Sequence, residues 1–70
     1  MIKLHRLNKK PFYLNHRLIE TVESNPDTTI HLINGQSIIV LESPEEIQER
    51  IIDFERKIFY DKIIKIADKK

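Results

Sequence analysis

The fold is decided by one stretch of the chain, residues 28–46, which reads TTIHLINGQSIIVLESPEE. Two runs of β-branched and aliphatic residues stand on either side of Asn34-Gly35, and this dipeptide is the strongest short signal for a β-hairpin. The stretch ends in Ser-Pro-Glu-Glu, which is typical of the first turn of an α-helix. It therefore predicts two paired strands, Thr28–Ile33 and Gln36–Leu41, followed directly by a helix.

The pairing of these two strands follows from the length of their loop. A two-residue type I′ loop at Asn34-Gly35 pairs Ile33 with Gln36 and Thr29 with Val40. Because side chains alternate along a strand, this register assigns every residue to one face of the hairpin. The face predicted to cover the core carries Ile30, Leu32, Ile39 and Leu41. The opposite face carries Thr29, His31, Ile33, Ile38 and Val40. This second face is too apolar for full exposure to water, so we expect Ile33, Ile38 and Val40 to meet an oligomer or a partner.

The helix is predicted over residues 43–68, with clear periodicity to about Ile66. Ser43 can cap the first turn, Pro44 suits the first helical position, and Glu46 completes a capping box. Acidic residues near the start and lysines near the end both complement the helix dipole. No glycine or proline follows Pro44, so nothing in the sequence interrupts the helix.

This helix carries two apolar stripes, which lie about 100° apart around its axis. The first is assigned to the core and comprises Ile47, Ile51, Phe54 and Ile58. The second comprises Ile52, Phe59, Ile63 and Ile66. A helix of this length spans roughly 35 Å, whereas a strand of six residues spans only about 20 Å. The second stripe therefore has to meet something beyond its own sheet, and we expect it to form an oligomer or partner interface.

The residues before residue 28 are also predicted to form strands. Segments rich in β-branched and aromatic residues lie at Ile2–Leu7, Phe12–Leu14 and Leu18–Glu23, and Asn25-Pro26-Asp27 predicts a turn. The predicted fold class is α+β: a small antiparallel β-meander of four or five short strands over residues 1–42, followed by one long C-terminal α-helix. We expect residues 1–70 to form a single domain.

Composition restricts the chemistry that the chain can perform. A core built from 70 residues is small, and self-association is a common way to stabilise such a core. There is no cysteine and only one glycine, which excludes thiolate sites and a glycine-rich phosphate loop. The histidines His5, His16 and His31 lack metal-ligand spacing, and no serine or threonine stands in a triad pattern. We therefore expect no enzymatic activity, no metal and no cofactor.

The charges are nearly balanced, with 12 basic and 11 acidic residues and a net charge of +1. The N-terminus does not read as a signal peptide and no run of about 20 apolar residues occurs, so we expect a cytoplasmic protein. Several lysines gather toward the end of the predicted helix: Lys57, Lys62, Lys65, Lys69 and Lys70. Such a group can contact an anionic membrane surface. The alternative is a solvated helix end, which the intervening Asp61 and Asp68 favour.

Several segments in order also resemble a known family. They are MIKLHRLN at residues 1–8, FYLN at residues 12–15 and LIETVESNPDT at residues 18–28, followed by the Ile33-Asn34-Gly35 hairpin and Glu42-Ser43 at the helix start. Over about residues 1–58 the chain is similar to the FlbD family of small bacterial flagellar proteins, which includes swarming-motility proteins of the SwrD kind.

The resemblance implies a contribution to flagellar motility, with a link to the motor or the stator complex, and no catalytic activity. Together with the apolar surplus, it predicts a non-enzymatic accessory protein that self-associates and binds a motor or stator component at the inner face of the membrane. One position departs from the family pattern, because Lys9 stands where the family usually has glycine in the first hairpin. Lysine resists positive φ, so we expect a longer or differently shaped turn there.

A second class of protein also fits a small strand-rich chain with a C-terminal helix. RNA-binding regulators of the CsrA or Sm-like kind have this outline, and Arg6, Arg17 and Arg50 could contact phosphates. The nearly neutral charge and the few aromatic residues argue against this alternative, since RNA recognition uses a basic surface and stacking side chains. A salt-sensitive gel shift with cellular RNA distinguishes the two classes.

Overall fold

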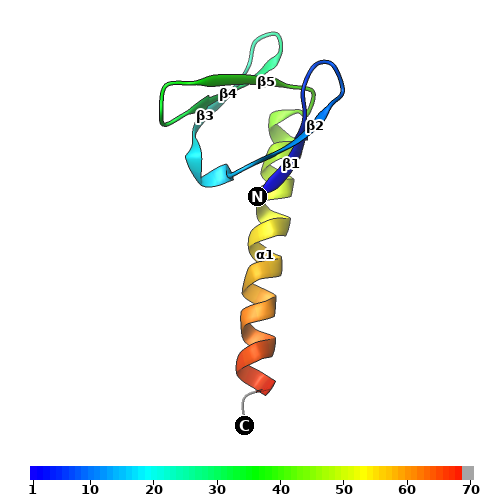
Figure 1. Ribbon diagram of the computed structural model, residues 1–70, viewed down its shortest axis with the longest axis vertical. Coiled ribbons are helices and arrows are strands. Elements are labelled where there is room, and N and C mark those ends of the chain that lie inside the picture. The colour runs from blue at the N-terminus through cyan, green and yellow to red at the C-terminus, as the bar shows by residue number, and fades with distance from the viewer. Residues whose placement is uncertain (69–70) are drawn as a thin grey trace.

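The computed structural model of the protein describes residues 1–68, with side chains as far as Lys65. In chain order its elements are β1 (Ile2–His5), β2 (Pro11–Leu14), the short 3₁₀ helix η1 (His16–Leu18), β3 (Ile19–Ser24), β4 (Thr28–Leu32), β5 (Ser37–Val40) and α1 (Pro44–Asp68). The predicted α+β class, with short antiparallel strands followed by one long helix, is confirmed (Figure 1).

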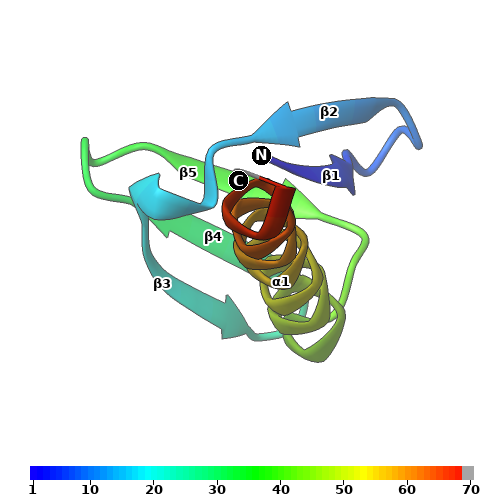
Figure 2. The ribbon, with the colours of Figure 1, turned by 90° about the horizontal axis from the view of Figure 1, so that it is seen from below.

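The strands form two antiparallel sheets, where the sequence predicted one meander. One sheet pairs β1 with β2, and the other has the order β3-β4-β5. The two sheets touch where β5 ends, because Arg6 forms an isolated bridge with Val40 and the Leu41 N–H donates to the His5 carbonyl at 2.9 Å. Viewed along α1, the two sheets lie on different sides of the helix (Figure 2). They therefore pack against its first turns from two sides, and Ile47 is buried between them.

The β4–β5 hairpin has a different register from the predicted one. Its loop contains three residues, 33–35, because Gly35 N–H donates to the Leu32 carbonyl at 3.0 Å and Leu32 N–H donates to the Gln36 carbonyl at 2.8 Å. Gly35 alone takes a positive φ, +88°, and the Asn34 side chain accepts from the Gln36 N–H. This is the three-residue loop in which a left-handed residue completes the turn, and it competes with the type I′ loop for the same sequence.

The changed loop moves β5 by one residue against β4. Ile30 faces Ile38 and Thr29 faces Ile39, whereas the two-residue loop would pair Ile30 with Ile39. A one-residue shift exchanges the two faces of a strand, so the predicted faces of β5 are wrong. Ile38 packs against the core and Val40 is buried within it, whereas Ile39 and Leu41 are exposed.

The β1–β2 hairpin is built in the same way, in spite of Lys9. Its loop also has three residues, 7–9, closed by hydrogen bonds from Lys9 N–H to the Arg6 carbonyl and from Arg6 N–H to the Lys10 carbonyl. Asn8 accepts from the Lys10 N–H at 3.0 Å, as Asn34 does in the other hairpin. Lys9 takes φ +70°, and the loop has the same length and hydrogen bonds as the loop at Gly35, so the expected longer or differently shaped turn is not found. The lysine instead adopts the left-handed conformation that glycine favours.

The core lies between the two sheets and the first turns of α1. The buried apolar residues are Ile2, Leu4, Leu14, Ile30, Leu32, Val40 and Ile47. Ile51 and Phe54 pack against this cluster, as their helical spacing from Ile47 predicted, and Ile58 is half-buried. All four residues of the first stripe therefore lie toward the domain.

The start of α1 is capped as predicted. The Glu46 N–H donates to the Ser43 hydroxyl at 3.1 Å, and the Ser43 N–H donates to the Glu46 carboxylate at 3.2 Å. This reciprocal pair satisfies two backbone groups that the helix cannot satisfy by itself. From this start α1 runs well past the sheets, and the molecule measures 52 × 24 × 18 Å (Figure 1).

Candidate functional surface

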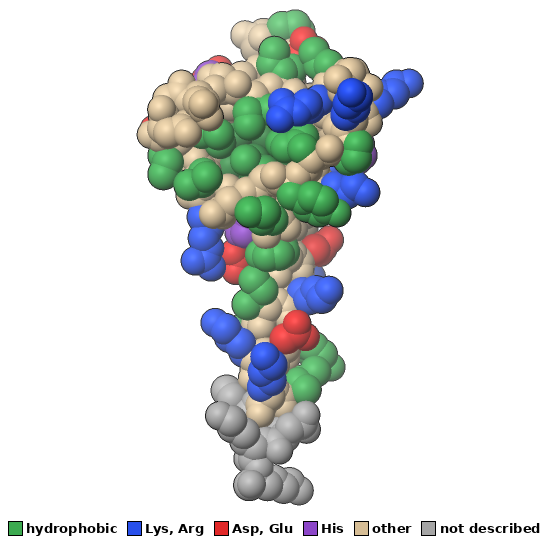
Figure 3. All heavy atoms as spheres, in the orientation of Figure 1, with side chains coloured by type: hydrophobic (Ala, Val, Ile, Leu, Met, Phe, Trp, Pro, Cys, Tyr) green, Lys and Arg blue, Asp and Glu red, His purple; other side chains and the backbone are tan. Residues whose placement is uncertain are grey.

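The part of α1 that leaves the domain carries exposed apolar side chains. Ile52 is 40% exposed, Phe59 66% and Ile63 47%, and we call these three residues the distal stripe. The side chain of Ile66, the fourth residue predicted for this stripe, lies outside the described part of the chain. Figure 3 shows apolar side chains along this segment among Lys, Arg, Asp and Glu side chains. The structure thus leaves the distal stripe uncovered.

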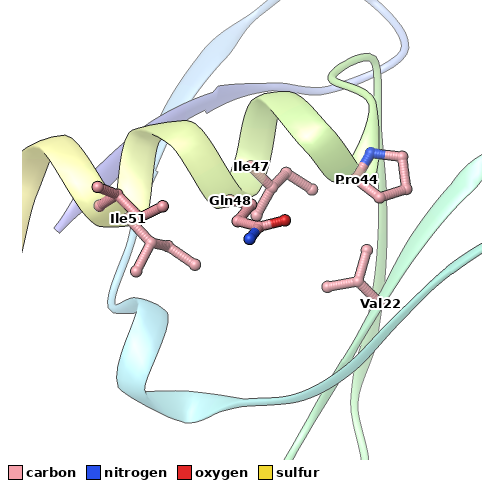
Figure 4. Close-up of a pocket in the computed structure, with 6 residues that line it drawn as sticks. Val22, Pro44, Ile47, Gln48 and Ile51 are labelled. Carbon is pink, nitrogen blue, oxygen red and sulfur yellow. The ribbon is translucent and has the colours of Figure 1, made fainter.

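An apolar groove lies beside the upper part of the same helix, between α1 and β3. It has a volume of about 340 Å³. Its lining residues are Val22, Pro44, Ile47, Gln48, Ile51 and Ile52. In Figure 4, Val22 on β3 faces Pro44 across this space. Ile52 belongs to both the groove and the distal stripe, so the two surfaces are continuous.

This groove could not be predicted from the sequence. Its wall on β3 comes from Val22, more than 20 residues before the helix, and only the packing of α1 against the sheets brings that residue near Pro44. The apolar character of Ile52 was the available signal, since this residue lies outside the core stripe.

The hairpin residues predicted for an interface lie in different places. Ile33 is 61% exposed at the loop, where its N–H donates to the carbonyl of Leu18, which is also exposed. Val40 and Ile38 point toward the core because of the corrected register, and the prediction that they form a surface is wrong. Ile33 and Leu18 therefore form a second exposed apolar surface, which we call the hairpin tip.

The lysines predicted for an anionic surface are exposed as far as the structure describes them. Lys57, Lys62 and Lys65 lie on α1 beyond the domain, and Asp61 is exposed among them. Lys69 and Lys70 lie outside the described residues. The lysines are thus accessible to a charged surface but share the helix with acidic side chains.

A polar cluster ties the start of α1 to β1. Glu42 is 5% exposed, and its carboxylate accepts from the His5 backbone N–H at 2.8 Å and from the Arg50 guanidinium at 2.8 Å. The His5 ring Nδ1 lies 2.6 Å from the same carboxylate. Arg50 also donates to the Lys3 carbonyl at 2.6 Å.

The ionisation of Glu42 reflects these contacts. Burial by itself raises the pKa of a carboxyl group, but the hydrogen bonds from the His5 ring, the His5 backbone and Arg50 outweigh burial and lower the pKa of Glu42 to about 2. A carboxylate of such low pKa, with its oxygens already paired, stabilises the fold and is a poor general base.

A second pair fixes the direction in which α1 leaves the domain. His16 in η1 places its ring Nε2 2.7 Å from the Glu55 carboxylate, and the ring meets Phe54 edge-on at 5.3 Å. The hydrogen bond with His16, together with the nearby charge of Arg17, lowers the pKa of Glu55 although partial burial opposes this. Nδ1 of His16 is buried without a hydrogen-bond partner. These contacts hold α1 against η1 at its fourth turn.

The three arginines considered for RNA contacts are all engaged within the protein. Arg6 lies over the Phe12 ring at 4.5 Å, Arg17 lies 3.8 Å from Glu55, and Arg50 binds Glu42. Among the side chains that the structure describes, no group of three or more acidic or histidine residues is placed to hold a metal ion. The described residues therefore present apolar surfaces more clearly than a site for chemistry.

The model of one known protein family matches most of the chain. The model of the FlbD family, described as flagellar and swarming motility proteins, matches residues 1–59. The chain belongs to the FlbD family. Membership assigns it a role in flagellar or swarming motility, as the resemblance implied. No curated protein and no solved structure matches the chain.

The FlbD match ends close to where α1 leaves the domain. It includes both sheets, the groove and Ile52, whereas Ile63 lies beyond it. Within residues 1–68 of this FlbD protein, no helix combines the length and the apolar character needed to cross a membrane.

Proposed function

We propose that this FlbD protein is a non-enzymatic accessory factor that supports motility by binding a component of the flagellar motor or stator. The observation that carries the proposal is the apolar surface that the small domain leaves uncovered at the hairpin tip, formed by Ile33 and Leu18. Exposed apolar groups of this kind mark binding surfaces when they gather in one place. The family supplies the flagellar context.

The polar groups of the domain support a binding role over a catalytic one. Glu42 is held by His5 and Arg50, and the Nε2 atom of His16 is held by Glu55. These groups already have structural partners, so they are not poised to exchange protons with a substrate.

The proposed location is the cytoplasmic side of the membrane at the flagellar base. Lys57, Lys62 and Lys65 are exposed near the far end of the helix, where they can approach anionic lipid headgroups. Such contact is favourable by about 1 kcal/mol per lysine close to the surface, which helps to orient a bound protein without anchoring it alone.

The experiment is a clean deletion in the native organism, with swimming, swarming, filament number and motor torque measured together. We expect weak motility with a normal number of filaments and low torque, restored by the wild-type chain. Lost filaments would instead indicate a role in assembly or gene expression, and normal motility would refute the proposal.

The hairpin tip is tested by Ile33→Glu in the same strain. Leu7→Glu is the matched control, because Leu7 is exposed at the same position of the equivalent loop in the other hairpin. We expect Ile33→Glu to reduce torque while Leu7→Glu leaves it unchanged. Equal loss in both variants would show that the hairpin tip is not a specific contact.

A further inference from the structure

The far half of α1 has little to hold it in place within one copy of the chain. The hydrogen bond between Glu55 and His16 is the last one that ties α1 to the rest of the domain among the described residues, and Ile58 is half-buried. Phe59, Ile63 and Ile64 are all exposed on the turns that follow. A helix segment of this length is marginal in water by itself, and tertiary or quaternary packing usually stabilises it.

The distal stripe has the spacing of a helix–helix contact. Ile52, Phe59 and Ile63 follow one another at intervals of seven and four residues, which keeps them within roughly 40° on a helix with about 3.6 residues per turn. The groove opens beside the same stripe at Ile52. A second helix seated on the stripe would therefore also cover the groove.

The charges of α1 indicate what kind of helix can pack against the distal stripe. Its first half is acidic, with Glu45, Glu46, Glu49, Asp53 and Glu55 against Arg50 alone. Its second half is basic, with Arg56, Lys57, Lys62 and Lys65 against Asp61 and Asp68. A second copy running in the opposite direction places basic residues beside acidic ones. The dipoles of the two helices then also point in opposite directions, which is favourable. A parallel copy would place like charges together.

We propose that α1 pairs with α1 of a second copy in an antiparallel, two-fold symmetric dimer. Ile63 of each copy lies against Ile52 of the other, and Phe59 lies over Arg56 near the symmetry axis. The far turns of each helix then cover the groove of the other copy. Such an interface uses the same surface on both subunits, so it closes at two.

One ionic contact accompanies this register. Lys62 stands one position before Ile63, on the side of the helix that faces the groove, and it comes opposite Glu55 of the other copy. The dimer would thus extend the pair of Glu55 and His16 into a cluster shared between the subunits.

The first test is sedimentation of the full chain over a range of concentrations. We expect twice the 8.4 kDa mass of the single chain. Ile63→Glu places an unpaired carboxylate in the interface and should weaken the dimer at least tenfold. Ile64→Glu is the matched control, because Ile64 is similarly exposed but lies about 100° from Ile63 around the helix, and it should leave the dimer intact.

The second test determines the direction of the helices, and it uses the absence of cysteine from the chain. Mixed under oxidising conditions, Ile52→Cys and Ile63→Cys chains should form the mixed disulfide. Each variant alone should not, because position 52 lies roughly 16 Å along the axis from its own symmetry mate at about 1.5 Å per residue. A disulfide needs a Cα separation below about 7 Å.

The outcomes separate the alternatives. Self-linked Ile63→Cys chains would show a parallel pair and overturn the proposed arrangement, and equal dissociation by Ile64→Glu would overturn the assigned face. A chain that stays monomeric at all concentrations overturns the dimer. If that monomer binds phosphatidylglycerol vesicles through the stripe, a membrane surface is the occupant instead. None of these results depends on the motility assays, so the dimer and the flagellar role can fail separately.

Discussion

Replacing Glu42 with glutamine keeps the shape of the side chain and removes its charge from the cluster that joins β1 to α1. The carboxylate is 5% exposed and accepts hydrogen bonds from His5 and Arg50. In the variant, the side-chain amide of residue 42 replaces one of the two accepting oxygens with an NH₂ group. This NH₂ group then faces a donor of His5 or Arg50, to which it cannot form a hydrogen bond. We therefore expect a folded but less stable protein.

The size of the effect follows from the pKa of Glu42, which falls from 4.5 to about 2 on folding. That fall corresponds to about 3 kcal/mol of stability at about 1.36 kcal/mol per pKa unit. His5 and Arg50 are each about one third exposed, so water screens part of this interaction and we expect a loss of about 2 kcal/mol for Glu42→Gln at neutral pH.

The pH dependence gives the sharper test. Because the pKa of Glu42 is lower in the folded protein, its contribution is fully present above pH 4.5 and is lost as the pH falls from 4.5 toward 2. Glu42→Gln removes this component, so the difference in unfolding free energy between wild type and variant should shrink through that window.

The measurement is urea unfolding followed by circular dichroism at one protein concentration, for wild type, Glu42→Gln and the control Glu20→Gln, which changes an exposed carboxylate on β3. Stability profiles of wild type and Glu42→Gln that stay parallel across the window would refute the reasoning. So would a loss at neutral pH no larger than that of Glu20→Gln.

Three further outcomes test the backbone and the helix cap. Lys9 has φ +70°, a conformation that glycine adopts more easily than lysine. Lys9→Gly should therefore stabilise the protein by about 1 kcal/mol and raise its melting temperature by about 4–8 °C. A lower melting temperature would contradict the left-handed turn. Gly35→Ala should cost about 1 kcal/mol through its φ of +88° alone, since an added Cβ meets nothing within 4 Å, and a neutral result in the same melting experiment would count against that conformation. Ser43→Ala should lower the free energy of unfolding by about 1 kcal/mol, because it removes the helix cap. Glu46→Gln preserves the reciprocal hydrogen bonds and should lower it less. Equal urea midpoints for the two variants would show that the capping box contributes little.

The core side of α1 could be predicted from the sequence because the signal is local. Ile47, Ile51 and Phe54 recur at helical spacing, and Ser43 and Glu46 meet within one turn. The exposed residues Ile52, Phe59 and Ile63 could be separated from them for the same reason. Their interpretation as a binding surface is a prediction that the dimer experiments test.

The strand faces of β5 could not be predicted as firmly. Asn34-Gly35 suits both a two-residue and a three-residue loop, and the choice between them exchanges Val40 with Ile39 between core and surface. Packing of the whole β5 face against Ile30 and β1 favours the register in which Val40 is buried. The residues of the turn alone do not determine this packing energy.

The sequence by itself determined the order of strands and helix, the helix start at Ser43 and the two stripes of α1, because these depend on neighbours a few residues apart. Only the tertiary structure decided the register of the second hairpin, the burial of Glu42 between His5 and Arg50, and the groove between Val22 and Pro44. Each of these depends on side chains that are distant in the chain, and they meet only when the packing of both sheets against α1 lowers the free energy of the whole domain.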